Sequence, residues 1–156
     1  MVEVALYEPE IPPNTGNVIR LCANTGATLH LIEPLGFRID EASVKRAGLD
    51  YHQMANVHRH ASLDALKAAR PQARWLAFST RGTVRYDQCC FRDGDILLFG
   101  PESRGLPQDI LDALPPEQCL KLPMRPGNRS INLSNTVAIA VFEAWRQTGF
   151  AGAMPG

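Results

Sequence analysis

Residues 95–106, DILLFGPESRGL, join a short apolar segment to a loop rich in turn-forming residues. The run from Asp95 to Phe99 has the length and aliphatic content of a buried strand, and Gly100 and Pro101 end it. The same order, an apolar run followed by Gly, Pro or a polar cluster, recurs along the chain. The expected strands are Val2–Tyr7, Leu29–Ile32, Trp75–Ser79, Asp95–Phe99 and Cys119–Leu122.

Helical patterns lie between these strands. Apolar residues at helical spacing run from Val18 to Thr25, with Asn14 or Thr15 as the expected N-cap and Gly26 as the stop. Each helix is therefore expected to connect one strand to the next.

Two more helices have recognisable ends. Ser62 is the expected cap of a helix over Leu63–Arg70, which Pro71 ends. Pro107 occupies an expected first helical position ahead of an apolar pattern that reaches Leu114.

This alternation predicts an α/β fold, a mainly parallel sheet with helices on both faces. The length of 156 residues fits a single domain over 1–156. The segment Gly36–His60 is the least periodic, and we expect a long connection there that carries Arg38, Lys45 and Arg46.

The last helix is apolar nearly all round. Val137–Phe142 is an uninterrupted apolar run, and Ala144 and Trp145 follow it. A helix of this kind buries one side against the sheet and leaves an apolar patch on the other. The pattern favours a homodimer that uses this helix, and a fully covered core helix is the alternative.

The composition is that of an ordinary globular protein, with 45% hydrophobic and 21% charged residues. Sixteen basic and sixteen acidic side chains cancel, but they are segregated along the chain. Residues 20–92 have a net charge of +5 and residues 121–156 of +3, whereas 1–19 and 93–120 are acidic. Thirteen of the bases are arginine, the residue suited to phosphate recognition. The net neutrality excludes a strong non-specific polyanion binder, and the segregation leaves room for a localised arginine surface.

The cysteines and the termini indicate a cytoplasmic protein. The four cysteines form no C-x-x-C pair, so we expect reduced thiols and no zinc site. No apolar run approaches the roughly 20 residues of a membrane span, and the acidic N-terminus is unlike a signal peptide. Neither a membrane nor a metal is an expected partner.

Four turn-rich loops follow expected strands. In parallel α/β sheets ligands bind beyond the carboxyl ends of the strands, so these loops predict a binding site at one edge of the sheet. They are residues 12–17, 79–82, 100–105 and 123–132.

The chemistry of this site is narrowed by exclusion. The chain has no P-loop, no G-x-G-x-x-G and no G-x-S-x-G motif. The H-x-H at His58 and His60 is most simply a strand-edge or solvated pair, and Glu102 is the only carboxylate in these four loops. A nucleotide-binding hydrolase therefore lacks an acid/base pair.

Arginines and amides remain as the candidate functional groups. Arg20 lies opposite the apolar stripe of the first helix, within two turns of a helix N-terminus that suits a phosphate. With Arg125 and Arg129 in another loop, the sheet edge could hold a nucleic-acid backbone.

Three motifs in order resemble those of the SPOUT superfamily of RNA methyltransferases. Over the whole chain the resemblance is to its minimal tRNA wobble-ribose 2′-O-methyltransferases. The motifs are Asn14–Arg20, Leu98–Leu106 and Leu122–Asn135.

The resemblance implies a fold and a cofactor that periodicity does not show. The C-terminal part would form a deep trefoil knot that holds S-adenosylmethionine largely through backbone groups. The implied cofactor-binding residues are Phe78, Thr80, Gly100, Glu102, Leu122, Ser130 and Ile131.

The implied substrate is the anticodon stem-loop of tRNA. Methyl transfer would take place to the ribose 2′-hydroxyl of cytidine or 5-carboxymethylaminomethyluridine at position 34 of leucine tRNAs. The implied catalytic residues are Arg20, Arg129 and Asn135, and the implied tRNA contacts are Asn14, Arg20, Arg129 and Asn132.

Arg20 is the implied base or electrostatic group. Arginine side chains are effectively always protonated, which favours stabilisation of the developing alkoxide over proton removal. Phe142 departs from the tyrosine common in close relatives, so a hydroxyl contribution is missing there. The alternatives are methylation of another tRNA or rRNA position, and a non-catalytic RNA-binding module of the same fold.

Overall fold

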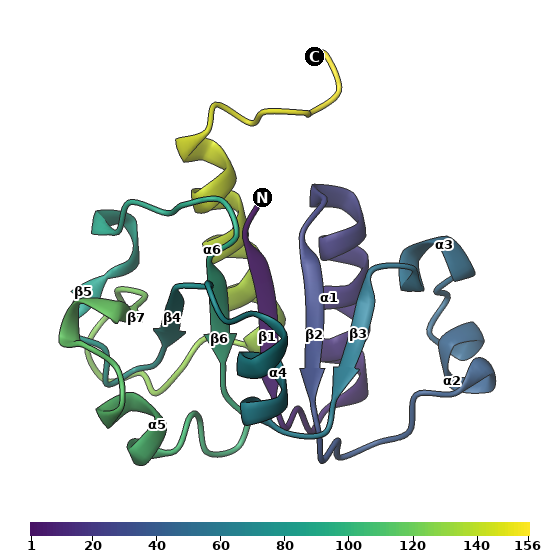
Figure 1. The fold of residues 1–156 in the computed structure, drawn as a ribbon, viewed down its shortest axis with the longest axis horizontal. Coiled ribbons are helices and arrows are strands. Elements are labelled where there is room, and N and C mark those ends of the chain that lie inside the picture. Colours follow the sequence, from purple (N-terminus) through teal and green to yellow (C-terminus); the bar gives the residue numbers. More distant parts are fainter.

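The computed structural model describes residues 1–156 and contains one seven-stranded sheet (Figure 1). Its strand order is β3-β2-β1-β6-β4-β7-β5, and every neighbouring pair is parallel. The predicted parallel sheet is therefore confirmed. The strands are β1 (Glu3–Tyr7), β2 (Thr28–Ile32), β3 (Val57–His60), β4 (Trp75–Phe78), β5 (Val84–Arg85), β6 (Ile96–Phe99) and β7 (Cys119–Lys121).

Helices cover both faces of this sheet, as predicted (Figure 1). On one face α1 (Pro12–Thr25) and α6 (Leu133–Gln147) pack on a core that includes Val4, Leu97 and Val141. On the other, α4 (Leu63–Ala69) and α5 (Gln108–Asp112) cover a smaller core. The remaining helices are α2 (Glu41–Arg46), α3 (Tyr51–Met54), η1 (Tyr86–Gln88) and η2 (Pro116–Gln118).

The central strands are apolar on both sides because both faces are covered. In β6 all four residues are buried, and in β1 Val4 and Leu6 face one core while Ala5 faces the other. These runs are the strongest strand signals in the sequence, and they form the middle of the sheet.

The expected long connection over Gly36–His60 is wrong, because it contains α2, α3 and β3. Neither helix has a buried residue, so apolar periodicity could not reveal them. Each begins with a capping box instead, at Asp40 and at Asp50. The edge strand β3 is polar, and the two-residue β5 is too short to predict.

Two helix starts also differ from the expectation. The N-cap of α1 is Ile11, so Asn14 and Thr15 lie buried in the first turn and do not cap it. Pro107 is the N-cap of α5 and not its first residue. The stop at Gly26 is confirmed by its φ of 82°, and the Ser62 cap by its bond from the Ala65 amide.

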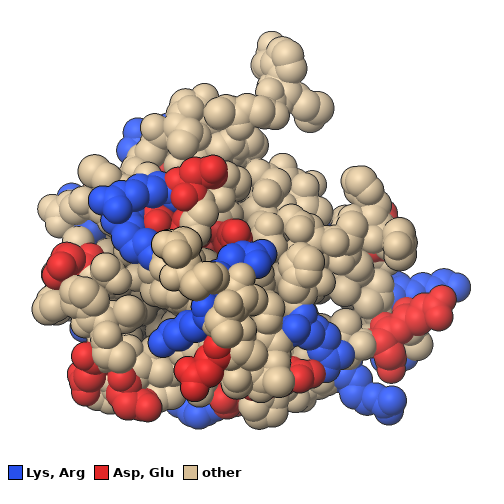
Figure 2. All heavy atoms as spheres, in the orientation of Figure 1, with Lys and Arg blue, Asp and Glu red and all other residues tan.

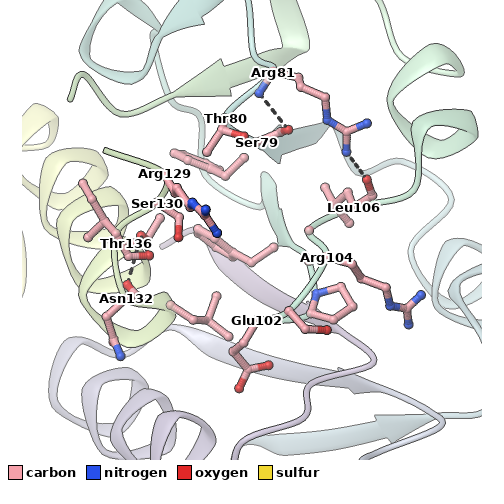
Figure 3. A pocket seen from close by; sticks show the side chains of 18 of the residues that line it. Ser79, Thr80, Arg81, Glu102, Arg104, Leu106, Arg129, Ser130, Asn132 and Thr136 are labelled. Atoms are coloured by element: carbon pink, nitrogen blue, oxygen red, sulfur yellow. Dashed lines mark hydrogen bonds between the residues drawn. The ribbon is translucent and has the colours of Figure 1, made fainter. Parts of the chain in front are cut away.

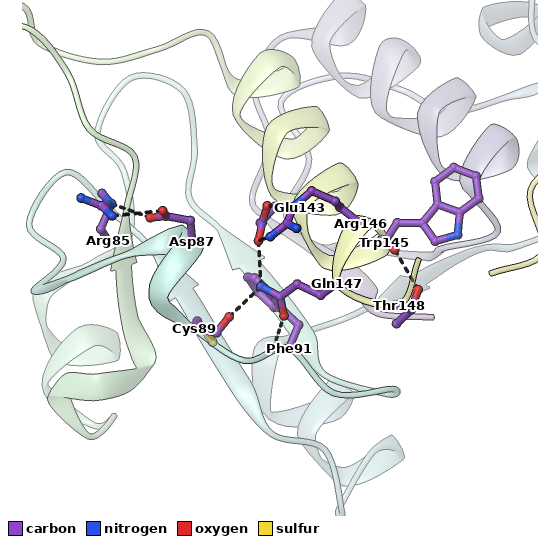
Figure 4. A network of polar contacts seen from close by, with 9 residues as sticks. All are labelled: Arg85, Asp87, Cys89, Phe91, Glu143, Trp145, Arg146, Gln147 and Thr148. Atoms are coloured by element: carbon purple, nitrogen blue, oxygen red, sulfur yellow. Dashed lines mark hydrogen bonds and ion pairs between the residues drawn. The ribbon is translucent and has the colours of Figure 1, made fainter. Parts of the chain in front are cut away.

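The last helix begins and ends at identifiable contacts. The Asn132 side chain caps it by accepting from the Asn135 amide at 3.3 Å. At the other end Gln147 donates to the Cys89 carbonyl at 2.9 Å and accepts from the Phe91 amide at 3.0 Å (Figure 4). These bonds tie α6 to the segment that leads into β6.

The outer side of α6 is exposed. Ile139 and Phe142 are 37% and 44% exposed, while Val137, Ala140, Val141 and Ala144 are buried. No helix is long and apolar enough to cross a membrane. Basic and acidic side chains are interspersed over the face shown in Figure 2.

Candidate functional site

A cavity of about 600 Å³ lies at the carboxyl ends of β4, β6 and β7 (Figure 3). This volume lies within the range of small-molecule sites, roughly 300–1,000 Å³. All seven residues predicted to bind the cofactor line it: Phe78, Thr80, Gly100, Glu102, Leu122, Ser130 and Ile131. Three of the predicted substrate or catalytic residues, Asn14, Arg129 and Asn132, line it as well.

Two glycines let the loops around the cavity approach backbone to backbone. A Cβ at Gly100 would overlap the Leu106 amide nitrogen and the Gly105 backbone. A Cβ at Gly82 would overlap the Leu120 carbonyl. Glycine is required at both positions because any side chain there would overlap the backbone of the neighbouring segment.

Several backbone N–H groups of the cavity have no acceptor within the chain. Those of Gly100, Leu106 and Leu122 donate no hydrogen bond to another group of the protein. Leu106 is only 1% exposed, and a buried amide of this kind requires a partner. The cavity therefore suits a ligand with hydrogen-bond acceptors along one edge, as an adenosine group has.

The carboxylates of Glu102 and Glu10 join the loop after β6 to the loop after β1. The Glu102 carboxylate accepts from the amides of Glu10 at 2.9 Å and Ile11 at 2.8 Å. In return Glu10 accepts from the amide and hydroxyl of Ser103, and these bonds lower the pKa of Glu10. The carboxylate of Glu102 thus holds the loops together, although the residue lines the cavity.

Asn14 connects the three predicted motifs. Its Nδ2 donates to Glu102 at 3.2 Å, and its Oδ1 accepts from Asn132 Nδ2 at 3.1 Å. Asn132 also caps α6 through the Asn135 amide. Asn14 was predicted as a tRNA contact, and its buried side chain is used in these internal bonds.

The two predicted catalytic arginines have different surroundings. The guanidinium of Arg129 points into the cavity and makes no hydrogen bond or ion pair (Figure 3). Arg20 is half-buried and donates to the Ala47 carbonyl at 3.0 Å, at the C-terminal end of α2. Neither Arg20 nor Asn135 lines the cavity, so the structure brings together only part of the predicted catalytic set.

One contact across the cavity, made by Arg81, was not expected from the sequence. The guanidinium of Arg81, in the loop after β4, donates to the Leu106 carbonyl and to Gln108 Oε1. The Arg81 loop has the turn residues of a strand exit, which is a usable signal. Gln108 has no such signal, since it lies in an ordinary first helical turn.

A histidine cluster lies away from the cavity, under α4. The ring of His30 is buried, with Nδ1 2.8 Å from His60 Nε2 and Nε2 2.6 Å from Glu3. His58 and His60 both lie in the edge strand β3, so the expected strand-edge pair is confirmed; His58 is exposed, whereas His60 contacts His30. Burial lowers the pKa of His30 and outweighs the opposing contact with Glu3.

The parallel α/β fold and a cavity at the carboxyl ends of the strands, rimmed by arginine and amide side chains, are typical of α/β proteins that bind a ligand at this edge of the sheet. The chain belongs more narrowly to the SpoU rRNA Methylase family, whose pattern matches residues 1–142. The resemblance to RNA methyltransferases is thereby confirmed.

Close relatives match over nearly the full length. A tRNA (cytidine(34)-2'-O)-methyltransferase of Burkholderia ambifaria is 62% identical over 97% of this chain and 99% of the relative. The protein of the same name from Escherichia coli K12 is 55% identical, over 99% of this chain and 98% of its own length.

Solved structures agree on the fold. A structure described by "Structural insights into the 2-OH methylation of C/U34 on tRNA" has a TM-score of 0.88 at 48% identity, over 96% of this chain and 97% of that one. The SpoU methyltransferase AviRb of Streptomyces viridochromogenes with AdoMet has a TM-score of 0.76, over 99% of this chain and 59% of that one. Its identity of 22% supports the fold alone.

Proposed function

We propose that the protein transfers the methyl group of S-adenosylmethionine to the ribose 2′-hydroxyl of the wobble nucleotide of leucine tRNAs. The nucleotide is cytidine or 5-carboxymethylaminomethyluridine at position 34. The observation that carries this proposal is the cavity. Its walls come from all three predicted motifs, in a chain of the SpoU family whose full-length relatives are named for this reaction.

S-adenosylmethionine fits the cavity by size and by polarity. The unpartnered amides of Gly100, Leu106 and Leu122 match acceptors of the adenosine group, and Phe78 and Ile131 supply apolar walls. Thr80, Glu102 and Ser130 complete the proposed binding set. When bound, the cofactor supplies an electrophilic methyl group on a sulfonium.

The protein must position a weak nucleophile and stabilise its charge. A ribose 2′-hydroxyl needs alignment with the methyl group and help for the developing alkoxide. Arg129 has a free guanidinium for a phosphate of the substrate, and Asn132 and Asn135 orient the nucleotide at the start of α6.

Arg20 acts in this proposal as an electrostatic group, with the RNA phosphate as proton acceptor. A permanently charged guanidinium stabilises an alkoxide more readily than it accepts a proton. One nitrogen of Arg20 donates to the Ala47 carbonyl, and the remaining N–H groups of the guanidinium are available for the alkoxide.

The knot is a further part of the proposal. Strand β7 lies between β4 and β5 although it follows both in the sequence. The loop after β4 rests on it, with the Ser79 amide 3.0 Å from the Leu120 carbonyl and Thr83 bonded to Cys119. We propose that residues 123–132 thread past these loops before α6 begins, as in a trefoil knot.

The proposed assembly is a cytoplasmic homodimer of one domain per chain, residues 1–156, with neither metal nor membrane as partner. The exposed Ile139 and Phe142 of α6 support a partner on that face. A second subunit also adds surface for the anticodon stem-loop.

The competing hypothesis is that the protein methylates ribosomal RNA, because the description of its family names rRNA. Labelled S-adenosylmethionine is incubated with unmodified tRNA, native tRNA and ribosomal RNA, and the label is traced to single nucleosides. The proposal expects label on a tRNA ribose. Label on a base, or on ribosomal RNA only, would overturn it.

One variant tests the role of Arg20. Arg20→Ala should retain cofactor binding in calorimetry and lose methyl transfer. Arg59→Ala, an exposed arginine paired with Glu33 at the far edge of the sheet, is the matched control. Full transfer by Arg20→Ala would remove Arg20 from the mechanism.

A further inference from the structure

The side chain of Arg81 crosses from one wall of the cavity to another (Figure 3). Its Nη1 lies 2.5 Å from Gln108 Oε1, and its Nη2 donates to the Leu106 carbonyl. All three residues line the cavity. One guanidinium thus joins the loop after β4 to the loop between β6 and α5.

The loop that carries Arg81 is firmly held. The Arg81 amide donates to Ser79 Oγ at 3.1 Å, and Gly82 packs directly on the Leu120 backbone. Thr83 is bonded through its amide to Cys119 and through its hydroxyl to the Pro116 carbonyl at 2.7 Å. The guanidinium therefore extends from a fixed base.

The far end of the contact is oriented as well. Gln108 Nε2 donates to Asp112 Oδ1 at 2.8 Å, which turns its Oε1 toward Arg81. Because Gln108 and Asp112 are four residues apart in α5, this bond lies along the helix surface. The guanidinium meets an acceptor that is already in place.

The residue held by Arg81 is the one with the buried, unpartnered amide. Arg81 binds the carbonyl of Leu106, and the N–H of the same residue has no acceptor in the chain. That amide also contacts Gly100 so closely that a Cβ there would overlap it. The position of this donor in the cavity therefore depends on Arg81.

The contact does not serve as an ion pair. Both acceptors of Arg81 are uncharged, whereas the neighbouring Arg104 pairs with Glu8 at 2.8 Å. Removal of the Arg81 guanidinium leaves no carboxylate unpaired, but it leaves the Leu106 carbonyl without its donor, so the free energy of unfolding should fall by the cost of one unpaired acceptor.

We propose that Arg81 is a positioning residue for the cofactor cavity. Its guanidinium holds residues 105–108 in the shape that binds the adenosine group of S-adenosylmethionine. The inference rests on the proposed function, because it assumes that this cofactor occupies the cavity.

Calorimetry with two ligands tests the inference. S-adenosylhomocysteine carries the amino-acid group of the cofactor, and 5′-methylthioadenosine lacks it. Arg81→Met keeps the aliphatic stem and removes the donors, and should weaken both ligands by the same factor, roughly tenfold. Arg81→Lys should recover part of the affinity by donating to Leu106.

Two further variants sharpen the test. Gln108→Ala should weaken both ligands, and the double variant should lose less than the two single losses combined, since the residues act as one contact. Arg85→Met, an exposed arginine that pairs with Asp87 and does not line the cavity, is the matched control and should bind normally. In turnover, Arg81→Met should raise the KM for S-adenosylmethionine and leave the KM for tRNA unchanged.

Each contrary result has a distinct meaning. Unaltered affinity in Arg81→Met would overturn the inference, and a loss confined to S-adenosylhomocysteine would overturn it in favour of direct contact with the amino-acid group. If the protein without substitutions bound neither ligand, the proposed function itself would be overturned. Thermal unfolding of each variant, measured in parallel, identifies a loss of affinity caused by misfolding.

Discussion

Replacement of Asn14 by alanine should destabilise the protein more than any exposed asparagine replacement. Asn14 is 7% exposed and bonds to Glu102 at 3.2 Å and to Asn132 at 3.1 Å. The substitution leaves the Asn132 amide unpaired, while Glu102 keeps its bonds from the Glu10 and Ile11 amides.

The magnitude follows from these two bonds. A bond to a charged carboxylate contributes about 1.5–3 kcal/mol and a neutral one about 1 kcal/mol, so the free energy of unfolding should fall by about 2.5–4 kcal/mol. For a domain of this size the Tm should fall by about 5–16 °C. Urea titration and calorimetry measure the two quantities.

The control is Asn56→Ala. Asn56 is exposed and makes one side-chain bond, to Thr28 at 3.1 Å, so its removal should cost about 0.5 kcal/mol or less. Equal losses for Asn14→Ala and Asn56→Ala would refute the reasoning. So would strict additivity of Asn14→Ala with Asn132→Ala, since the two side chains share one bond.

Three further changes test other parts of the structure. Gly100→Ala should abolish S-adenosylhomocysteine binding in calorimetry, because the added Cβ displaces the Leu106 backbone; normal binding would contradict this role of the close backbone contact at Gly100. Acidification should lower the free energy of unfolding, because the neutral form of His30 is favoured in the fold. This stability is complete above the unfolded pKa of about 6.5 and is lost as the pH falls through the lowered folded pKa, at about 1.4 kcal/mol for each unit between the two. Denaturation at pH 7.5 to 5 should show the full loss in His52→Gln, whose exposed ring is a control. The loss should be smaller in His30→Gln, which keeps His60, a residue whose pKa burial also lowers. An equal slope in both variants would exclude His30. Phe142→Asp should shift the protein from dimer to monomer in analytical ultracentrifugation, and an unchanged mass would remove α6 from the interface.

The middle of the sheet could be predicted from the sequence, and its edges could not. β1, β4 and β6 are buried on both faces, so their apolar runs are continuous, and the structure shortens them by only one residue. β3 is polar because it lies at an edge, and α2 and α3 bury nothing. Such elements are stabilised by capping residues and by neighbouring segments, and neither produces a periodic apolar pattern in the sequence.

The cavity was predicted better than its internal contacts. Strand-end loops are recognisable by their turn residues, and the motif resemblance identified which of them come together. The bonds of Asn14 to Glu102 and to Asn132 span 88 and 118 positions along the chain, and nothing in the sequence pairs these residues. The bond from Arg20 to Ala47 was missed for the same reason, since α2 itself was not expected.

The central claim is methyl transfer to the 2′-oxygen of nucleotide 34. Two leucine tRNAs that differ only by a 2′-deoxyribose at position 34 are incubated with the protein and labelled S-adenosylmethionine. The ribose tRNA should accept the label on nucleotide 34, and the deoxyribose tRNA should accept none. Equal labelling of both tRNAs would contradict the account.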